Sequence, residues 1–284
     1  MYPVVFRIGD MPITSFGIMM FLSFVVGAWV LGKQLERYGM DSRLAWDLLA
    51  GIAIGGILGA RLYYNALHFD AFLANPIGEL LQRGGLVWYG GFIGGVAGYY
   101  YQVRKRKLPL AMMFDATAPA LAVAYAIGRM GCFLVGDDYG LPTDHWIGIA
   151  FPQGSPPTSA GYLRSVGADV PQDVPDTAIL AVHPTQLYEV TAGLLMFAFL
   201  WRLGARPHRI GQPFAIFMCL YAVERFLIEF VRAKGDRLVL GLSTSQIASF
   251  VLLAAGLLIL LRYKGPLVDP SRGIHPAKAR QPAA

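Results

Sequence analysis

The chain has 284 residues, of which 55% are hydrophobic and only 15% are charged. Soluble domains carry about 25% charged residues, so this composition excludes an ordinary soluble domain and indicates a membrane protein. The formal net charge of +6 fits attraction to anionic lipid, and we expect no nucleic-acid partner.

Seven apolar segments are long enough, or nearly so, to cross a hydrocarbon core, which takes about 20 helical residues. They are Ser15–Leu31, Trp46–Leu67, Leu86–Val103, Met112–Phe133, Leu187–Leu203, Pro213–Val231 and Thr244–Leu261. Backbone polar groups must be satisfied internally in lipid, which favours helices. We therefore predict an all-α polytopic membrane protein, a single bundle of about seven transmembrane helices with a periplasmic loop or head region.

Basic residues mark the loops that follow the first, third, fifth and seventh segments. They are Lys33, Arg37, Arg43, Arg104, Lys105, Arg106, Lys107, Arg202, Arg206, Arg209, Arg262 and Lys264. By the positive-inside rule, the N-terminus lies outside and the C-terminus is cytoplasmic. Arg232, Lys234 and Arg237 depart from this pattern, with Glu229 and Asp236 among them. The start of the chain lacks signal-peptide features, so we expect insertion through its own helices.

The loops suggest one membrane domain, residues 1–265, followed by a tail, residues 266–284. Residues 134–185 are rich in Pro, Gly, Asp and Ser, and we expect them to form an elaboration on the outer, periplasmic side. The tail carries Pro, Lys and Arg and is predicted to be disordered and cytoplasmic.

Glycines recur every four residues on the second and third segments. They are Gly51, Gly55, Gly59, Gly90, Gly94 and Gly98. Small residues at this spacing let helix backbones approach closely, so tight packing is the predicted role. A narrow lipid-entry groove at the Gly90 end is the alternative.

An arginine lies about one turn from the end of the fourth segment, in the sequence Gly128-Arg129-Met130-Gly131-Cys132-Phe133-Leu134-Val135-Gly136-Asp137-Asp138-Tyr139-Gly140. Charge at membrane depth costs about 2.5–3.5 kcal/mol on insertion scales, so such a residue usually faces a polar cavity and has a function. Two carboxylates and two glycines follow at the water boundary. The pattern predicts a site for an anionic lipid headgroup.

Further ionisable groups lie in the second and sixth segments. Arg225 and Glu229 are four residues apart, so they project from one helix face and are expected to pair. In the predicted orientation, Arg61, Arg129 and Arg225 lie in the outer half of the membrane and share one chamber if their side chains converge. The alternatives are a pair that only neutralises itself and an Arg61 that extends to the interface.

A second polar motif, His183 to Glu189, opens the fifth segment. Thr185 is a candidate helix cap, and Tyr188 suits an interfacial position. We interpret His183 as a hydrogen-bonding residue, whereas Glu189 lies close to the start of a membrane segment and is a candidate for function.

The two cysteines, Cys132 and Cys219, lie in different apolar segments. We interpret both as small buried hydrophobic residues, and we predict no disulfide and no metal site. The alternative is that Cys132 acts as a covalent nucleophile.

These motifs resemble those of the prolipoprotein diacylglyceryl transferase family, bacterial inner-membrane enzymes that begin lipoprotein maturation. The resemblance runs from about Ile13 to Leu261 and is carried by residues 128–140, 183–189 and 224–232. It implies transfer of diacylglycerol from phosphatidylglycerol to the lipobox cysteine thiol of a secreted precursor. The implied partners are phosphatidylglycerol, membrane lipid and prolipoprotein signal peptides, with no cofactor.

The chain departs from the family's usual pattern at functionally important positions. Phe16 stands where the family has tyrosine, Tyr89 where it has histidine, Cys132 and Val135 where it has asparagines, and Asp137 where it has glutamate. Two alternatives therefore stay open: a divergent member that acts on another lipid or acceptor, and a non-catalytic lipid-binding or transport protein.

Residue chemistry and the resemblance together suggest that Arg129 and Arg225 grip the leaving phosphate. A thiol reacts as a thiolate, so a carboxylate such as Asp137, Asp138 or Glu229 is expected to assist it. The alternative is that the field of the arginines stabilises the thiolate directly. The predicted catalytic residues are Arg129, Arg225, Glu229, Asp137 and Tyr89. The predicted substrate-binding residues are Arg129, Gly140, Arg61, His183, Glu189 and Tyr221.

Overall fold

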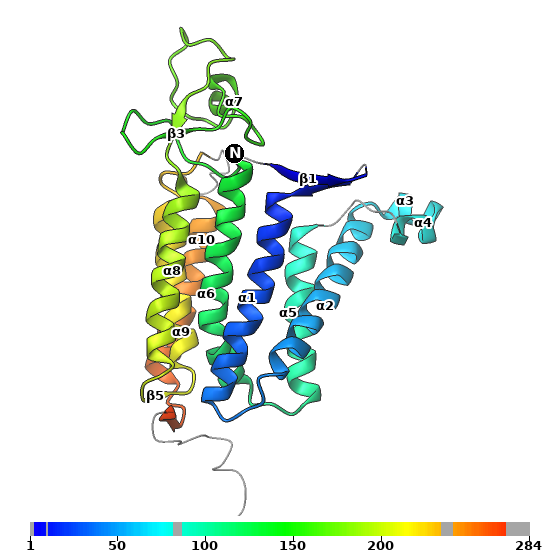
Figure 1. Ribbon diagram of the computed structural model, residues 1–284, viewed down its shortest axis with the longest axis vertical. Helices are drawn as coiled ribbons and strands as arrows, with labels where there is room; N and C mark the ends of the chain where they lie inside the picture. Colours follow the sequence, from blue (N-terminus) through cyan, green and yellow to red (C-terminus); the bar gives the residue numbers. More distant parts are fainter. Residues whose placement is uncertain (1–2, 10, 82–86, 234–240, 271–284) are drawn as a thin grey trace, which may run out of the picture.

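A computed structural model describes residues 3–9, 11–81, 87–233 and 241–270. Within these ranges, seven helices of 17 residues or more stand side by side as a bundle (Figure 1). They are α1 (Ser15–Arg37), α2 (Leu44–Leu67), α5 (Trp88–Lys105), α6 (Leu110–Val135), α8 (Thr185–Leu203), α9 (Gln212–Ile228) and α10 (Thr244–Arg262). Each overlaps one predicted segment, although the predicted start of the third, Leu86, lies outside the described residues.

Four of these helices, α1, α2, α6 and α10, are long and apolar enough to cross a membrane by length and composition. The described chain is therefore mostly helical with four candidate membrane-spanning helices. The count of seven spans stays a prediction, since α9 has only 17 residues and carries Glu224 and Arg225.

Local signals explain where several helices begin and end. The Thr14 hydroxyl accepts a hydrogen bond from the Gly17 amide at 3.1 Å at the start of α1, and Ser243 and Gln246 form a capping box on α10. Gly136 ends α6 with a φ of 74°, a left-handed conformation that glycine adopts without steric penalty. The chain therefore turns within two helical turns of Arg129.

Helices α2 and α5 pack through their glycines at the edge of the bundle, beyond α1 (Figure 1). A Cβ atom on Gly94 would overlap the carbonyl oxygen of Gly55, and one on Gly59 would overlap that of Gly90. The predicted tight packing is confirmed. Leu35, Leu48, Val103 and Met113 join this pair to α1 and α6 in an apolar core near the basic loops.

Residues 136–184 form an extension at one end of the bundle, here called the head (Figure 1). It contains β3 (Ile149–Ala150), α7 (Ala160–Ser165) and β4 (Ala181–Val182) around a small core with Phe151 and Leu163. The Arg164 guanidinium donates to the carbonyls of Pro171 and Val174, each at 2.5 Å. Buried apolar residues and one guanidinium thus order the segment that the sequence marked only as a long loop.

Several short elements complete the described chain. These are the antiparallel strands β1 (Val4–Ile8) and β2 (Met11–Thr14), the helices α3 (Phe69–Ala74) and α4 (Pro76–Leu81), and the antiparallel strands β5 (His208–Arg209) and β6 (Leu267–Val268). Strands this short leave no recognisable alternation in the sequence, so the all-α prediction omitted them. Strand β6 lies inside the predicted disordered tail, of which residues 271–284 lie outside the described ranges.

The close α2–α5 packing makes a specific prediction for adjacent glycines of α5. Gly94→Ala should lower the thermal unfolding midpoint of the detergent-solubilised protein, because its methyl group would meet the Gly55 backbone and cost about 1–3 kcal/mol. Gly95→Ala is the matched control, since its nearest neighbour, Ile52 Cγ2, lies at 3.5 Å. Equal midpoints for the two variants would contradict the described packing.

Candidate active site

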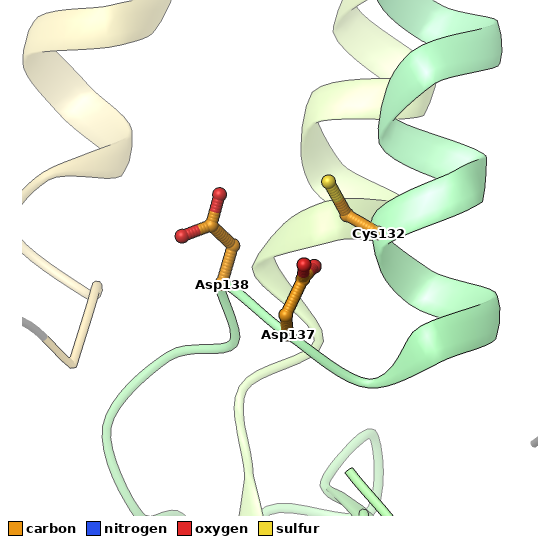
Figure 2. Close-up of side chains that lie close together, drawn as sticks. All are labelled: Cys132, Asp137 and Asp138. Carbon is orange, nitrogen blue, oxygen red and sulfur yellow. The ribbon is translucent and has the colours of Figure 1, made fainter. Parts of the chain in front are cut away.

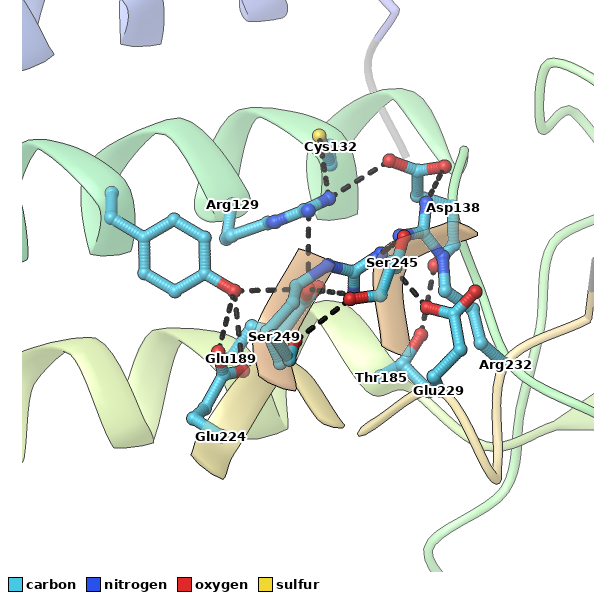
Figure 3. A network of polar contacts seen from close by, with 12 residues as sticks. Arg129, Cys132, Asp138, Thr185, Glu189, Glu224, Glu229, Arg232, Ser245 and Ser249 are labelled. Carbon is cyan, nitrogen blue, oxygen red and sulfur yellow. Dashed lines mark hydrogen bonds and ion pairs between the residues drawn. The ribbon is translucent and has the colours of Figure 1, made fainter. Parts of the chain in front are cut away.

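Four helix ends meet next to the head and bring ionisable side chains together. Helices α6 and α9 end there, and α8 and α10 begin there (Figures 1 and 3). The contributing residues include Arg129 on α6, Glu189 on α8, Arg225 on α9 and Ser245 on α10. The convergence of Arg129 and Arg225, which the sequence left open, is therefore observed.

Glu189 is the centre of this cluster, and its side chain is 0% exposed. Its Oε1 lies 3.1 Å from Nη2 of Arg129 and 3.6 Å from Nη1 of Arg225. The same oxygen accepts a hydrogen bond from the Tyr125 hydroxyl at 3.0 Å. One buried carboxylate thus pairs with two guanidinium groups from different helices, which offsets part of the cost of desolvating these charges.

Arg225 continues the network toward α10. Its Nη2 lies 2.9 Å from Oε2 of Glu229, which confirms the predicted i,i+4 pair. The same nitrogen donates to the Ser245 hydroxyl at 3.1 Å. Because Arg225 also contacts Glu189, the pair is part of a larger network and does not stand alone.

Arg129 and Arg232 share a second carboxylate, that of Asp138 (Figure 3). Arg129 Nη1 donates to Asp138 Oδ2 at 2.8 Å, and Arg232 pairs with the other oxygen. Burial opposes ionisation of Asp138, but Arg232 and Arg129 outweigh it and hold the pKa of Asp138 below its usual range. The Asp138 side chain is 42% exposed, so this carboxylate lies at the rim of the cluster.

The backbone around Gly140 holds the rim in place. The Gly140 amide donates to the His183 carbonyl at 2.8 Å. A Cβ atom at Gly140 would lie 2.5 Å from the carbonyl oxygen of Val231 and 2.8 Å from Cβ of His183, so only glycine fits. The prediction that Thr185 caps a helix beginning at Leu187 is wrong, because Thr185 is itself the first residue of α8 and its hydroxyl donates to the Asp138 carbonyl at 2.8 Å.

Cys132, Asp137 and Asp138 form a compact group, with one ligand-type atom from each within 4.8 Å of the others (Figure 2). Both oxygens of Asp138 already contact guanidinium groups, and a soft thiolate and hard carboxylates prefer different metals. We therefore assign no metal to this group. Asp137 Oδ1 is buried and accepts no hydrogen bond from the described residues, and burial, followed by the charge of Asp138, raises the pKa of Asp137.

The other predicted site residues lie at different distances from the cluster. Tyr221 reaches it through Tyr125, with ring centroids 5.3 Å apart, and the His183 ring lies 3.2 Å from the Tyr188 hydroxyl. Arg61 and Tyr89 lie on α2 and α5, which pack against each other on the far side of α1. Their roles in the site stay predictions.

Several participants, among them Tyr125, Arg232 and Ser245, were not singled out as site residues from the sequence. Tyr125 donates to Glu189 and also lies within 3.3 Å of both Glu224 oxygens. It precedes Arg129 by four residues, so helical periodicity could have placed the two on one face. A role for Arg232 or Ser245 was harder to predict from the sequence, because neither residue lies at a helical spacing from Arg129.

The central position of Glu189 predicts a large effect on stability. Glu189→Gln should lower the thermal unfolding midpoint strongly, because breaking a buried ion pair costs about 3–5 kcal/mol. Glu36→Gln is the control, since Glu36 pairs with Lys33 at 3.0 Å on an exposed surface, where such pairs contribute little. An unchanged midpoint for Glu189→Gln would show that the network does not stabilise the bundle.

Comparison with known proteins agrees with the resemblance of the motifs. Residues 3–262 match the family described as prolipoprotein diacylglyceryl transferase. A phosphatidylglycerol–prolipoprotein diacylglyceryl transferase of Clostridium tetani is 30% identical over 261 residues, covering 91% of this chain and 96% of the relative. The Stenotrophomonas maltophilia protein of the same name is 32% identical, with 94% of each chain covered, and that of Bordetella bronchiseptica is 33% identical, with 89% and 92% covered. The chain therefore belongs to the prolipoprotein diacylglyceryl transferase family.

Proposed function

We propose that this protein transfers the diacylglyceryl group of phosphatidylglycerol to the lipobox cysteine thiol of a prolipoprotein, the first step of lipoprotein maturation. Family membership and the names of the relatives support this activity. The single structural observation that carries it is a guanidinium, that of Arg129, held next to the head by the fully buried Glu189. Such an arrangement suits an anionic headgroup at the end of a membrane helix.

In the proposed reaction, the bond between the glyceryl carbon and a phosphate oxygen breaks, and a bond from that carbon to sulfur forms. The thiol proton leaves to a base, and the departing glycerol phosphate carries the released negative charge. Guanidinium donors stabilise that charge more strongly in a site with low dielectric than in water. Arg129 is the proposed donor, because its side chain reaches from the buried Glu189 to the rim at Asp138.

Arg225 has a different proposed role from the one that the sequence suggested. Its contacts are Glu189, Glu229 and Ser245, so its charge is already used inside the bundle. We assign Arg225 as a positioning residue that fixes Glu189 and, through it, Arg129. Glu229 is correspondingly the partner of Arg225.

Asp137 is the proposed base for the acceptor thiol. Its buried Oδ1 accepts no hydrogen bond from the described residues, and burial raises the pKa of Asp137, which makes its carboxylate a stronger base. Gly140, His183 and Tyr221 would shape the site, while Arg61 and Tyr89 stay predicted contributors on α2 and α5.

The finer topology is also part of this proposal. We infer seven spans in a bacterial inner membrane, with the N-terminus and the head on the periplasmic side and the C-terminus in the cytoplasm. The basic loops support this orientation, and the family supports the inner membrane as the location. Labelling of a Ser165→Cys variant by a membrane-impermeant maleimide in intact spheroplasts would test it, and protection of this residue would contradict it.

The activity is tested by supplying the purified protein with phosphatidylglycerol and a lipobox peptide. Arg129→Ala should lower kcat/KM by about 100-fold or more, the usual effect of losing one charge-stabilising donor. Arg129→Lys should rescue little, because an ammonium group cannot replace a bidentate guanidinium. Arg225→Ala should lower kcat with little change in KM, and Arg225→Lys should rescue it, because an ammonium group still neutralises Glu189.

Arg106→Ala is the control for these variants, since Arg106 forms an exposed ion pair with Asp47. Full activity of Arg129→Ala would remove Arg129 from the mechanism. Wild-type protein that binds lipid without turnover, or that modifies only hydroxyl or amine acceptors, would favour one of the two alternatives left open by the sequence.

The assignment of Asp137 predicts a pH dependence. A base must be deprotonated, so kcat/KM should fall as the pH drops through the raised pKa of Asp137. Asp138→Asn removes a neighbouring negative charge that raises this pKa, so the acidic limb of the profile should move to lower pH. Asp137→Asn should be inactive at every pH while keeping the wild-type unfolding midpoint. An acidic limb that does not move in Asp138→Asn would argue against Asp137.

A further inference from the structure

Asp138 holds two arginines in the way that a phosphodiester would. One carboxylate oxygen accepts from Arg129 at 2.8 Å, and the other pairs with Arg232 (Figure 3). An anionic phosphate between two arginines has the same contact pattern, because two oxygens on one central atom each face a different guanidinium. The place where these two side chains meet is therefore chemically suited to a phosphate group.

Asp138 is more exposed to water than the other acidic residues that pair with arginines. The side chains of Glu189 and Glu229 are 0% and 4% exposed, whereas that of Asp138 is 42% exposed. Removing Glu189 or Glu229 from its arginine would leave a buried charge without compensation, which is costly. The Asp138 carboxylate can instead turn to water, provided that an incoming anion takes its place next to the buried Arg232.

The backbone of Asp138 is held independently of its carboxylate. Its carbonyl accepts a hydrogen bond from the Thr185 hydroxyl at 2.8 Å, and the neighbouring Asp137 carbonyl accepts one from Gln186 Nε2 at 2.5 Å. A rotation of the Asp138 side chain toward solvent therefore does not require the loop to move.

Charge balance gives the reason for such a rotation. The described cluster contains the three arginines Arg129, Arg225 and Arg232, and each already contacts at least one carboxylate. Three carboxylates, those of Asp138, Glu189 and Glu229, form ion pairs with these arginines. An additional anion gains little in a cluster whose ion-paired charges already balance, unless one carboxylate gives up its place.

We propose that Arg129 and Arg232 form the phosphate subsite, and that Asp138 is an internal anion which occupies this subsite until a phosphate displaces it. The inference rests on the proposed function and adds Arg232 and Asp138 to its binding residues. Asp138 lowers the affinity for the lipid headgroup. By returning to the two arginines after the reaction, it also helps to release the glycerol phosphate product.

The test measures the affinity for glycerol phosphate by calorimetric titration of the full-length protein in phosphatidylcholine nanodiscs. Asp138→Asn should lower the Kd about tenfold, the change expected when a competing state populated about nine-tenths of the time is removed. Asparagine keeps the shape of the side chain and tolerates the φ of 56° at this position. A residue with only a structural role would weaken binding when replaced, or leave it unchanged.

Two further variants complete the comparison. Asp144→Asn removes an exposed carboxylate of the head and should leave the Kd unchanged, whereas Arg232→Gln should raise it. Unchanged or weaker binding by Asp138→Asn, with a wild-type unfolding midpoint, would overturn the proposal. So would equal tightening by Asp144→Asn, because it would show a general effect of net charge.

A second arm separates the lipid headgroup from a free phosphate. In the transfer assay, Asp138→Asn should lower the KM for phosphatidylglycerol presented in phosphatidylcholine vesicles. If only the affinity for glycerol phosphate increases, the subsite binds soluble anions and the headgroup assignment is overturned. If the wild-type protein transfers no lipid to any acceptor, the proposed function fails, while the titration still decides whether Asp138 competes with phosphate.

Discussion

The buried contact of Glu189 with Arg129 and Arg225 is the constraint on which the rest of the site depends. Two guanidinium groups cannot lie close together inside a membrane bundle without an anion between them, because both charges are desolvated there. Glu189 supplies that anion from a third helix, and the Tyr125 hydroxyl holds the same oxygen. The network therefore fixes the positions of α6, α8 and α9 at the end where they meet the head.

The bundle uses two different kinds of packing for its two parts. Helices α2 and α5 contact each other through backbone and glycine atoms, where van der Waals contact replaces the hydrophobic effect that lipid does not provide. Helices α6, α8, α9 and α10 carry larger side chains and enclose the polar network between them. The four helices around the polar network are thus braced by ion pairs, while α2 and α5 are held together by close backbone contact.

Exposure increases along the network from the centre of the bundle to the head. Glu189 is fully buried, Glu229 is nearly so, and Asp138 is partly open to water. The buried carboxylates of Glu189 and Glu229 can only hold arginines, because releasing an arginine would leave buried charges unpaired. A carboxylate at the rim can exchange partners with an incoming anion. Stability and ligand exchange are in this way assigned to different acidic residues of one connected cluster.

The sequence by itself determined the helical class, the approximate helix positions, the close α2–α5 packing and the pair of Arg225 with Glu229, because these follow from hydropathy and from spacings within one helix. It also identified the family, through motifs in three separate segments. Only the tertiary structure decided that Glu189 joins Arg129 to Arg225 and that Asp138 lies between Arg129 and Arg232. Those contacts join helix ends and loops that are distant along the chain, and no periodicity within a segment records which ends meet. The packing of the helices and the need to neutralise each buried charge decide which helix ends and loops meet.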